Sequence, residues 1–367
     1  MLALRPVGGT GVWYNLGRGR LGSVCEMGET AMRAISRKML APVLAALVIM
    51  GVATACEPYV HTFIADVGEV RDPAGPPVRY VDEVFTGVTV TSNITWGQAP
   101  NRAGAPVSLA LDLYEPSGDP VARRPALVVA HSGGFKVGSK TNAVSVDLAN
   151  RFARKGYVVI SIDYRMLALV DCGTLGGAIS DASGCKYAAM AATSDAQAAV
   201  RWLRANADAY RIDPTRIAMM GDSAGALMSI LNGMLADTPG NPDDPAAIEA
   251  MAGAPENTGN PGYSSEIQAW SSISGGLPPT ETPTLGAKLA ATATPTAPGY
   301  LFAATQDSQT PYQWSVDVRD VLVSIGRTVA FKSVVGGHVP YSTYKALFNE
   351  QTTRFFYLFL NLPAAEQ

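Results

Sequence analysis

The sequence Gly221-Asp222-Ser223-Ala224-Gly225 places a serine between two glycines, where an apolar run passes into a helix-forming one. This G-x-S-x-G pattern, with a strand before it and a helix after it, is typical of a sharp turn that exposes a nucleophilic serine. The glycines allow the strand and helix backbones to approach where a Cβ atom would collide. Ser223 is therefore the candidate nucleophile, and the alternative is an ordinary strand–turn–helix junction.

A serine nucleophile needs a general base, and histidine suits that task near neutral pH. The chain contains three histidines. His61 lies close to the N-terminal apolar run, and His131 ends a strand-like run and begins a glycine-rich loop. His338 lies in the loop VVGGHVPY after the last expected strand. By elimination and position, we expect His338 to be the base.

The third member of such a triad is a carboxylate between the serine and the histidine in chain order. Asp307 follows an apolar, strand-like run and lies between Ser223 and His338. It would hold the imidazole tautomer and stabilise the imidazolium that forms during catalysis. Asp317 and Asp320 are nearby alternatives, but both fall inside a segment with helical spacing.

The tetrahedral intermediate of acyl transfer carries a negative oxygen that needs hydrogen-bond donors. The loop HSGGFKVGS, residues 131–139, supplies the adjacent glycines Gly133 and Gly134. Their N–H groups, with that of Ala224 at the start of the helix after the nucleophile, would form an oxyanion hole. The alternative is a glycine-rich turn without a catalytic role. We expect His131 to be a scaffold residue that holds this loop.

Strand-like and helix-like segments alternate along the chain around these residues. Residues 87–97 and 107–116 alternate apolar and polar side chains, as half-exposed antiparallel strands do. The alternation of later segments predicts an α/β fold with a mostly parallel sheet. The later expected strands are 126–131, 157–164, 216–221, 269–275, 300–305 and 329–335, and the expected helices are 143–156, 187–210, 224–236, 311–325 and 342–359.

HSGGF, the DYR of residues 163–165, GDSAG and the trailing Asp307 and His338 resemble the motifs of α/β-hydrolase carboxylesterases. Among these the chain is similar to the hormone-sensitive-lipase group and to bacterial feruloyl- and acetyl-esterase-like members, over roughly residues 85–360. The resemblance implies a central sheet of about eight strands flanked by helices, a Ser-His-Asp triad, and no cofactor or metal. The family usually has glycine in place of Ser132, but a backbone donor does not require glycine there.

We divide the chain into a signal segment (1–55), a tether (56–84) and an α/β-hydrolase catalytic domain (85–362). A start at a later methionine is an alternative for the first segment. Insertions at about 166–186 and 238–264 are expected to form a lid or a pocket wall, because loops near an active face usually carry function.

The N-terminal region contains an uncharged apolar run, residues 40–55, preceded by basic residues. The run is shorter than the about 20 residues of a membrane-spanning helix, and it ends in Ala53-Thr54-Ala55, which suits signal peptidase. Cys56 follows directly, as in a bacterial lipobox. We expect an exported protein of a bacterial cell envelope, either secreted or lipid-anchored through Cys56. An uncleaved membrane anchor is the alternative.

Cys172 and Cys185 are separated by a loop rich in glycine and serine. In an oxidising compartment such a pair is expected to form a disulfide, which contributes roughly 3 kcal/mol of stability in the chain-entropy model. Two buried free thiols are the alternative. A zinc site is disfavoured, because no histidine or further cysteine lies nearby.

The composition argues against a nucleic-acid partner, and the motifs favour an enzyme. Lys and Arg number 28 against 31 Asp and Glu, with no basic block, so we expect no nucleic-acid partner. We expect a serine carboxylesterase acting on small-molecule esters with small or medium acyl groups, because no long apolar lid helix is evident. The alternatives are a peptidase or amidase on the same fold and a non-catalytic binding protein.

Overall fold

The computed structural model describes residues 63–64, 75–167, 182–235, 257, 259–279, 282 and 297–362. The chain divides into two units, Met1–Val60 and His61–Gln367, and all described residues belong to the second. The predicted signal segment, Cys56, Cys172 and most of the two insertions lie outside the described residues, so those predictions stay predictions. Within the described ranges, no helix combines the length and apolar character needed to span a membrane.

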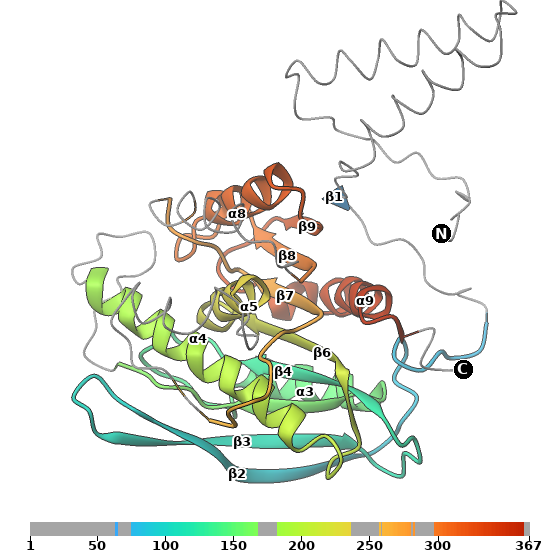
Figure 1. Cartoon of the computed structure of the whole chain (residues 1–367). Coiled ribbons are helices and arrows are strands. Elements are labelled where there is room, and N and C mark those ends of the chain that lie inside the picture. The colour runs from blue at the N-terminus through green and yellow to red at the C-terminus, as the bar shows by residue number, and fades with distance from the viewer. Residues whose placement is uncertain are drawn as a thin grey trace, which may run out of the picture. The chain divides into compact units, whose positions relative to one another are not determined.

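One nine-stranded sheet organises the second unit, in the order β1-β9-β8-β7-β6-β4-β5-β3-β2. Strand β3 pairs antiparallel with both β2 and β5, and every other pair is parallel. The mostly parallel α/β sheet predicted from the sequence is confirmed. The strands are β1 (Phe63–Ile64), β2 (Val88–Pro100), β3 (Pro106–Pro116), β4 (Arg124–Ala130), β5 (Val158–Ile162), β6 (Ile212–Asp222), β7 (Ala269–Ile273), β8 (Gly299–Ala304) and β9 (Val329–Val334) (Figure 1).

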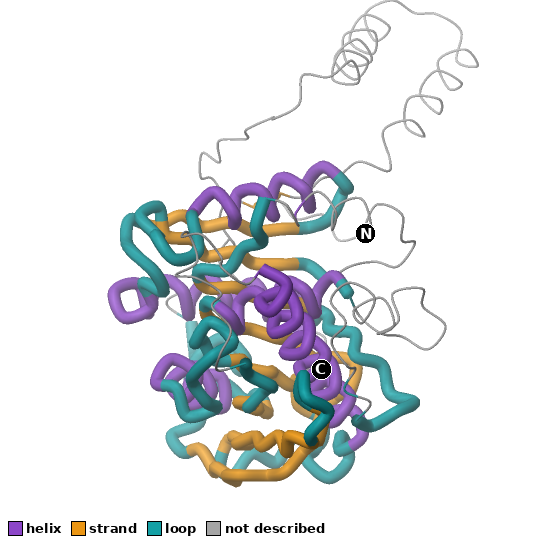
Figure 2. The backbone as a smooth tube through the Cα atoms, turned by 90° about the vertical axis from the view of Figure 1, so that its left-hand side faces the viewer, coloured by secondary structure: helices purple, strands orange, loops and turns teal. Residues whose placement is uncertain are grey.

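Helices cover both faces of this sheet, as Figure 2 shows from the side. Buried side chains of α4, α5 and α8 join one apolar cluster, and those of α3 and α9 join the other. Strand β4 serves both clusters, because Val128 points to the first and Val129 to the second. The helices are α3 (Ala143–Arg154), α4 (Ala182–Ala205), α5 (Ala224–Met234), α8 (Tyr312–Ser324) and α9 (Tyr341–Phe359).

Helix α4 begins and ends about five residues earlier than the sequence predicts. The helix begins at Ala182, five residues before the predicted 187, which shortens the expected insertion at 166–186. It ends at Ala205 rather than at 210. The hydrogen-bond pattern changes there: the Asn206 N–H still donates to the Trp202 carbonyl at 3.0 Å, whereas the Ala207 N–H donates to the Arg204 carbonyl at 3.3 Å, only three residues back.

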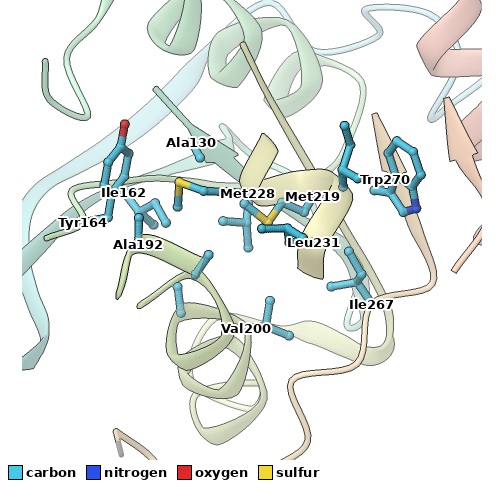
Figure 3. Close-up of a cluster of buried hydrophobic side chains, with 14 of the residues drawn as sticks. Ala130, Ile162, Tyr164, Ala192, Val200, Met219, Met228, Leu231, Ile267 and Trp270 are labelled. Carbon is cyan, nitrogen blue, oxygen red and sulfur yellow. The ribbon is translucent and has the colours of Figure 1, made fainter. Parts of the chain in front are cut away.

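The larger cluster lies between the sheet and helices α4 and α5. Figure 3 shows Met228 and Leu231 of α5 in one cluster with Met219 of β6 and Trp270 of β7, with Val200 of α4 below. All five side chains are nearly or completely removed from solvent. This packing holds the N-terminus of α5, and therefore residue 223, at the carboxyl edge of the sheet.

Candidate active site

Ser223 occupies the sharp turn between β6 and α5. Its backbone has φ 53° and ψ −111°, in a region that a residue with a side chain rarely adopts. The neighbouring glycines explain how the turn closes: a Cβ atom on Gly221 would lie 2.6 Å from the Ala130 carbonyl oxygen, and one on Gly225 would lie 2.0 Å from it. The Ser223 N–H donates to the Ile273 carbonyl at 2.9 Å. The turn thus packs closely against the end of β4, and the serine backbone is hydrogen-bonded to the end of β7.

The structure brings His338 and Asp307 to this serine. The Nε2 of His338 lies 2.8 Å from the Ser223 Oγ. The Nδ1 of the same ring lies 2.9 Å from Oδ2 and 3.0 Å from Oδ1 of Asp307. Asp307 follows strand β8, and His338 lies in the loop between β9 and α9. The arrangement allows proton transfer from the serine to an imidazole whose other nitrogen faces a carboxylate.

The surroundings of the Asp307 carboxylate favour its charged form. Burial alone would raise its pKa, but hydrogen bonds from His338 and from the N–H groups of Thr310 and Gln309 lower the pKa below its ordinary value. Asp317 and Asp320, the alternatives from the sequence, lie within α8. Their carboxylates pair with neighbours on that helix, Gln313 and Arg319, respectively. Of these three carboxylates, Asp307 is the one hydrogen-bonded to the imidazole.

The loop after β4 adopts backbone angles that favour glycine. Gly133 has φ 129°, Gly134 has φ 60°, and Phe135 has φ 62°. A Cβ atom on Gly133 would lie 1.8 Å from the Val137 carbonyl oxygen, so only glycine fits there, whereas one on Gly134 would meet nothing within 4 Å. Within the described residues, no hydrogen bond occupies the N–H of either glycine. Ala224, the third predicted donor, begins α5 beside the nucleophile.

The BD-FAE family model matches residues 111–252, which include the loop, the turn and the strands between them. This chain has the α/β-hydrolase fold, and its sequence is similar to those of carboxylesterases. The resemblance seen in the motifs is thereby confirmed, including the likeness to the hormone-sensitive-lipase group.

Curated relatives match this α/β-hydrolase over limited segments. Acetylcholinesterase of Gallus gallus is 33% identical over 163 residues, which cover 43% of this chain and 19% of that protein. Carboxylesterase NlhH of Mycobacterium tuberculosis is 31% identical over 118 residues, or 32% of this chain and 31% of that protein. The chain therefore spans less than one third of the length of either relative.

A solved structure shows the same fold over most of the chain. Thermogutta terrifontis esterase 2, in the form phosphoramylated by tabun, matches with a TM-score of 0.51 and 19% identity. The match covers 77% of this α/β-hydrolase and 97% of that chain. At this identity the likeness concerns the arrangement of the sheet and helices.

A further carboxylate beside the nucleophile was missed in the sequence. Asp222 is 1% exposed and accepts hydrogen bonds from the side chain and backbone of Ser132. Asn142 donates its Nδ2 to the same Ser132 Oγ at 3.2 Å. Burial raises the pKa of Asp222 to about 6, although the Ser132 hydrogen bonds and the nearby His338 act in the opposite direction. The available signal was the serine at 132, where the family usually has glycine.

His131 of this α/β-hydrolase has the surroundings expected of a scaffold residue. Its ring is fully buried and stacks on Tyr164 at 4.2 Å between centroids. The Tyr164 hydroxyl donates to the His131 carbonyl at 2.8 Å. Burial lowers the pKa of the imidazole, although its hydrogen bond with the Ser132 backbone acts the other way. A neutral, stacked ring fixes the base of the glycine loop.

Proposed function

We propose that this α/β-hydrolase is a serine carboxylesterase that cleaves esters with small or medium acyl groups, with Ser223, His338 and Asp307 as its catalytic triad. The observation that carries the proposal is the 2.8 Å contact between the His338 Nε2 and the Ser223 Oγ, with a carboxylate on the other ring nitrogen. The carboxylesterase-like sequence and the esterase fold of the structural neighbour support it.

In the acylation step, His338 accepts the hydroxyl proton as the Ser223 Oγ attacks the ester carbonyl carbon. The imidazolium that forms is stabilised by the Asp307 carboxylate. Collapse of the tetrahedral intermediate breaks the bond to the alcohol, which takes the proton from the His338 Nε2. The products of this step are the free alcohol and an acyl-serine.

In the deacylation step, His338 acts on water in the same way. It removes a proton as the water oxygen attacks the acyl-serine carbonyl, and then returns that proton to the Ser223 Oγ as the acid leaves. The N–H groups of Gly133, Gly134 and Ala224 are proposed to stabilise the negative oxygen in both steps. Removing one donor of this kind typically lowers kcat by about 10²- to 10³-fold.

The nucleophile proposal is tested by active-site labelling. Folded wild-type protein and the Ser223→Ala variant are treated with a fluorophosphonate, and the labelled residue is identified by peptide mass spectrometry. A label on Ser223 in the wild type, and none in the variant, is expected. A wild-type protein that remains unlabelled would instead favour the non-catalytic binding protein.

The substrate proposal is tested with p-nitrophenyl esters from acetate to palmitate and with matched p-nitroanilides. We expect the highest kcat/KM for short or medium acyl esters, with all activity lost in Ser223→Ala. Preference for the longest esters would overturn the acyl-size proposal. Turnover of the anilides without turnover of the esters would favour a peptidase or amidase.

We propose that the protein is exported and that Cys172 pairs with Cys185. The proposal is supported by the apolar run at 40–55 and by the isolated cysteine pair. Peptide mapping of envelope fractions under non-reducing conditions tests both parts, with lipidation of Cys56 read from the mass of the N-terminal peptide. Separate, free thiols in the exported protein would overturn the pairing.

A further inference from the structure

We infer that Ser274 is a positioning residue that holds the His338 loop in register with the nucleophile. The inference rests on the proposed triad and extends it to a residue whose side chain is hydrogen-bonded to the backbone next to the histidine. Ser274 directly follows β7, whose last residue is Ile273. It was not among the candidate residues from the sequence.

Two adjacent residues at the end of β7 form hydrogen bonds with the backbone of Ser223 and with the backbone of the residue after His338. The Ile273 carbonyl accepts a hydrogen bond from the Ser223 N–H at 2.9 Å. The Ser274 Oγ accepts one from the N–H of Val339 at 3.0 Å. Val339 is the residue directly after His338. The backbone of the nucleophile and the backbone next to the base are therefore hydrogen-bonded to neighbouring residues at the end of the same strand.

Both partners of the second hydrogen bond have unusual backbones. Ser274 has φ 54° and Val339 has φ 48°. A β-branched residue in this left-handed region is strained, and such conformations persist only where the surroundings impose them. The Ser274 N–H donates to the Phe302 carbonyl of β8 at 2.9 Å, which fixes Ser274 itself. The hydroxyl then supplies the acceptor that keeps the Val339 backbone in place.

Water cannot readily replace this hydroxyl, since Ser274 is only 1% exposed. Without it, the Val339 N–H loses its acceptor and the strained backbone is free to relax. The contact with Asp307 restrains one ring nitrogen of His338, but the chain that carries the ring would move. A misplacement of about 1 Å in a reacting group lowers the rate by as much as 10²-fold.

The experiment compares Ser274→Ala with Ser272→Ala. Ser272 is a matched control: it belongs to β7, is fully buried, and its Oγ has no hydrogen-bond partner among the described residues. We expect Ser274→Ala to lower kcat by about 10- to 100-fold with little change in KM. Ser272→Ala is expected to keep both constants within about 2-fold of the wild type.

A second variant, Ser274→Gly, covers the case in which Ser274→Ala does not fold. Glycine adopts a φ of 54° without strain, so this variant removes the hydroxyl and keeps the turn favourable. We expect the same fall in kcat, with urea unfolding close to that of the wild type. A variant that is stable but slow separates positioning from a purely structural role.

The outcomes separate this inference from the proposed function. Inactive Ser223→Ala together with slow, folded Ser274 variants supports both. Inactive Ser223→Ala with fully active Ser274→Gly overturns the role of Ser274 alone, as does an equal loss of kcat in Ser272→Ala. Unchanged activity in Ser223→Ala overturns the triad and, with it, the inference.

Discussion

The Oδ2 of Asp307 lies 2.9 Å from the Nδ1 of His338, although the two residues follow different strands of the sheet. Replacing Asp307 by asparagine keeps the size and removes the charge that stabilises the imidazolium. We expect Asp307→Asn to lower kcat by about 10³- to 10⁴-fold, as for buried triad carboxylates in general. Steady-state kinetics on a p-nitrophenyl ester measures the effect.

Asp320→Asn is the control for this variant, because Asp320 pairs with Arg319 on the surface of α8. It should leave kcat within about 2-fold of the wild type, since exposed ion pairs contribute little. Equal rates for Asp307→Asn and the wild type would exclude Asp307 as the third member of the triad.

The close approach of α5 to β4 predicts a large stability effect at Gly225. In Gly225→Ala, the added Cβ atom would lie 2.0 Å from the Ala130 carbonyl oxygen, which is backbone and cannot rotate away. We expect a loss of about 1–3 kcal/mol in the free energy of unfolding, or more, measured by urea denaturation. Gly97→Ala is the control, because its Cβ atom would find the nearest side chain at 3.8 Å. A stable Gly225→Ala variant would contradict the tight turn.

The hydrogen bonds of Ser132 predict that its side chain supports the buried Asp222. Ser132→Gly restores the residue usual in the family but removes a donor to a carboxylate that is 1% exposed. We expect the free energy of unfolding at pH 8 to fall by about 1–3 kcal/mol. Ser139→Ala, which removes a hydroxyl bonded to Thr141 at the surface, should change it little. Similar losses in both variants would argue against a special role for Ser132.

Burial of Asp222 predicts a pH-dependent stability. Its pKa is raised from 3.8 to about 6, so the folded protein binds the proton more tightly than the unfolded chain. The contribution of Asp222 therefore becomes less favourable as pH rises from about 4 to about 6, and it remains unfavourable above that range. Two pKa units correspond to roughly 3 kcal/mol.

Asp222→Asn removes this dependence, because the amide carries no charge. The variant should be more stable than the wild type at pH 8 and nearly equal to it at pH 4, as measured by urea unfolding at each pH. A constant difference across that range would show that Asp222 does not titrate near pH 6. Asp307 contributes in the opposite sense, because its lowered pKa adds stability that is lost only at acidic pH.

The sheet could be predicted because its main strands are either apolar or alternating runs, and most of the later ones are separated by segments with helical spacing. All eight expected strands are present, with ends shifted by a few residues. Strand β1 escaped prediction since its two residues, Phe63–Ile64, show no periodicity and pair only through β9. The early start of α4 also escaped, because Gly184 inside its first turns reads as a break in a single sequence.

The site was predictable where chain order and residue type restrict the choice. Three histidines leave few candidates for the base, and a G-x-S-x-G turn specifies its own backbone. Ser274 carries no comparable signal, and Ser132 differs from the family's usual glycine without indicating what its side chain does. Their roles depend on hydrogen bonds to Asp222 and Val339, which only the folded chain brings near.

The order of the strands has a consequence for biosynthesis. Strand β6, which ends beside the nucleophile, has β2–β5 on one side, and β7, β8 and β9 come later in the chain on the other. A ribosome that has translated about two thirds of the chain has already made Ser223, but neither Asp307 nor His338. Under the proposed mechanism, Ser223 therefore gains its base only after translation of the final third, and shorter chains lack a complete triad.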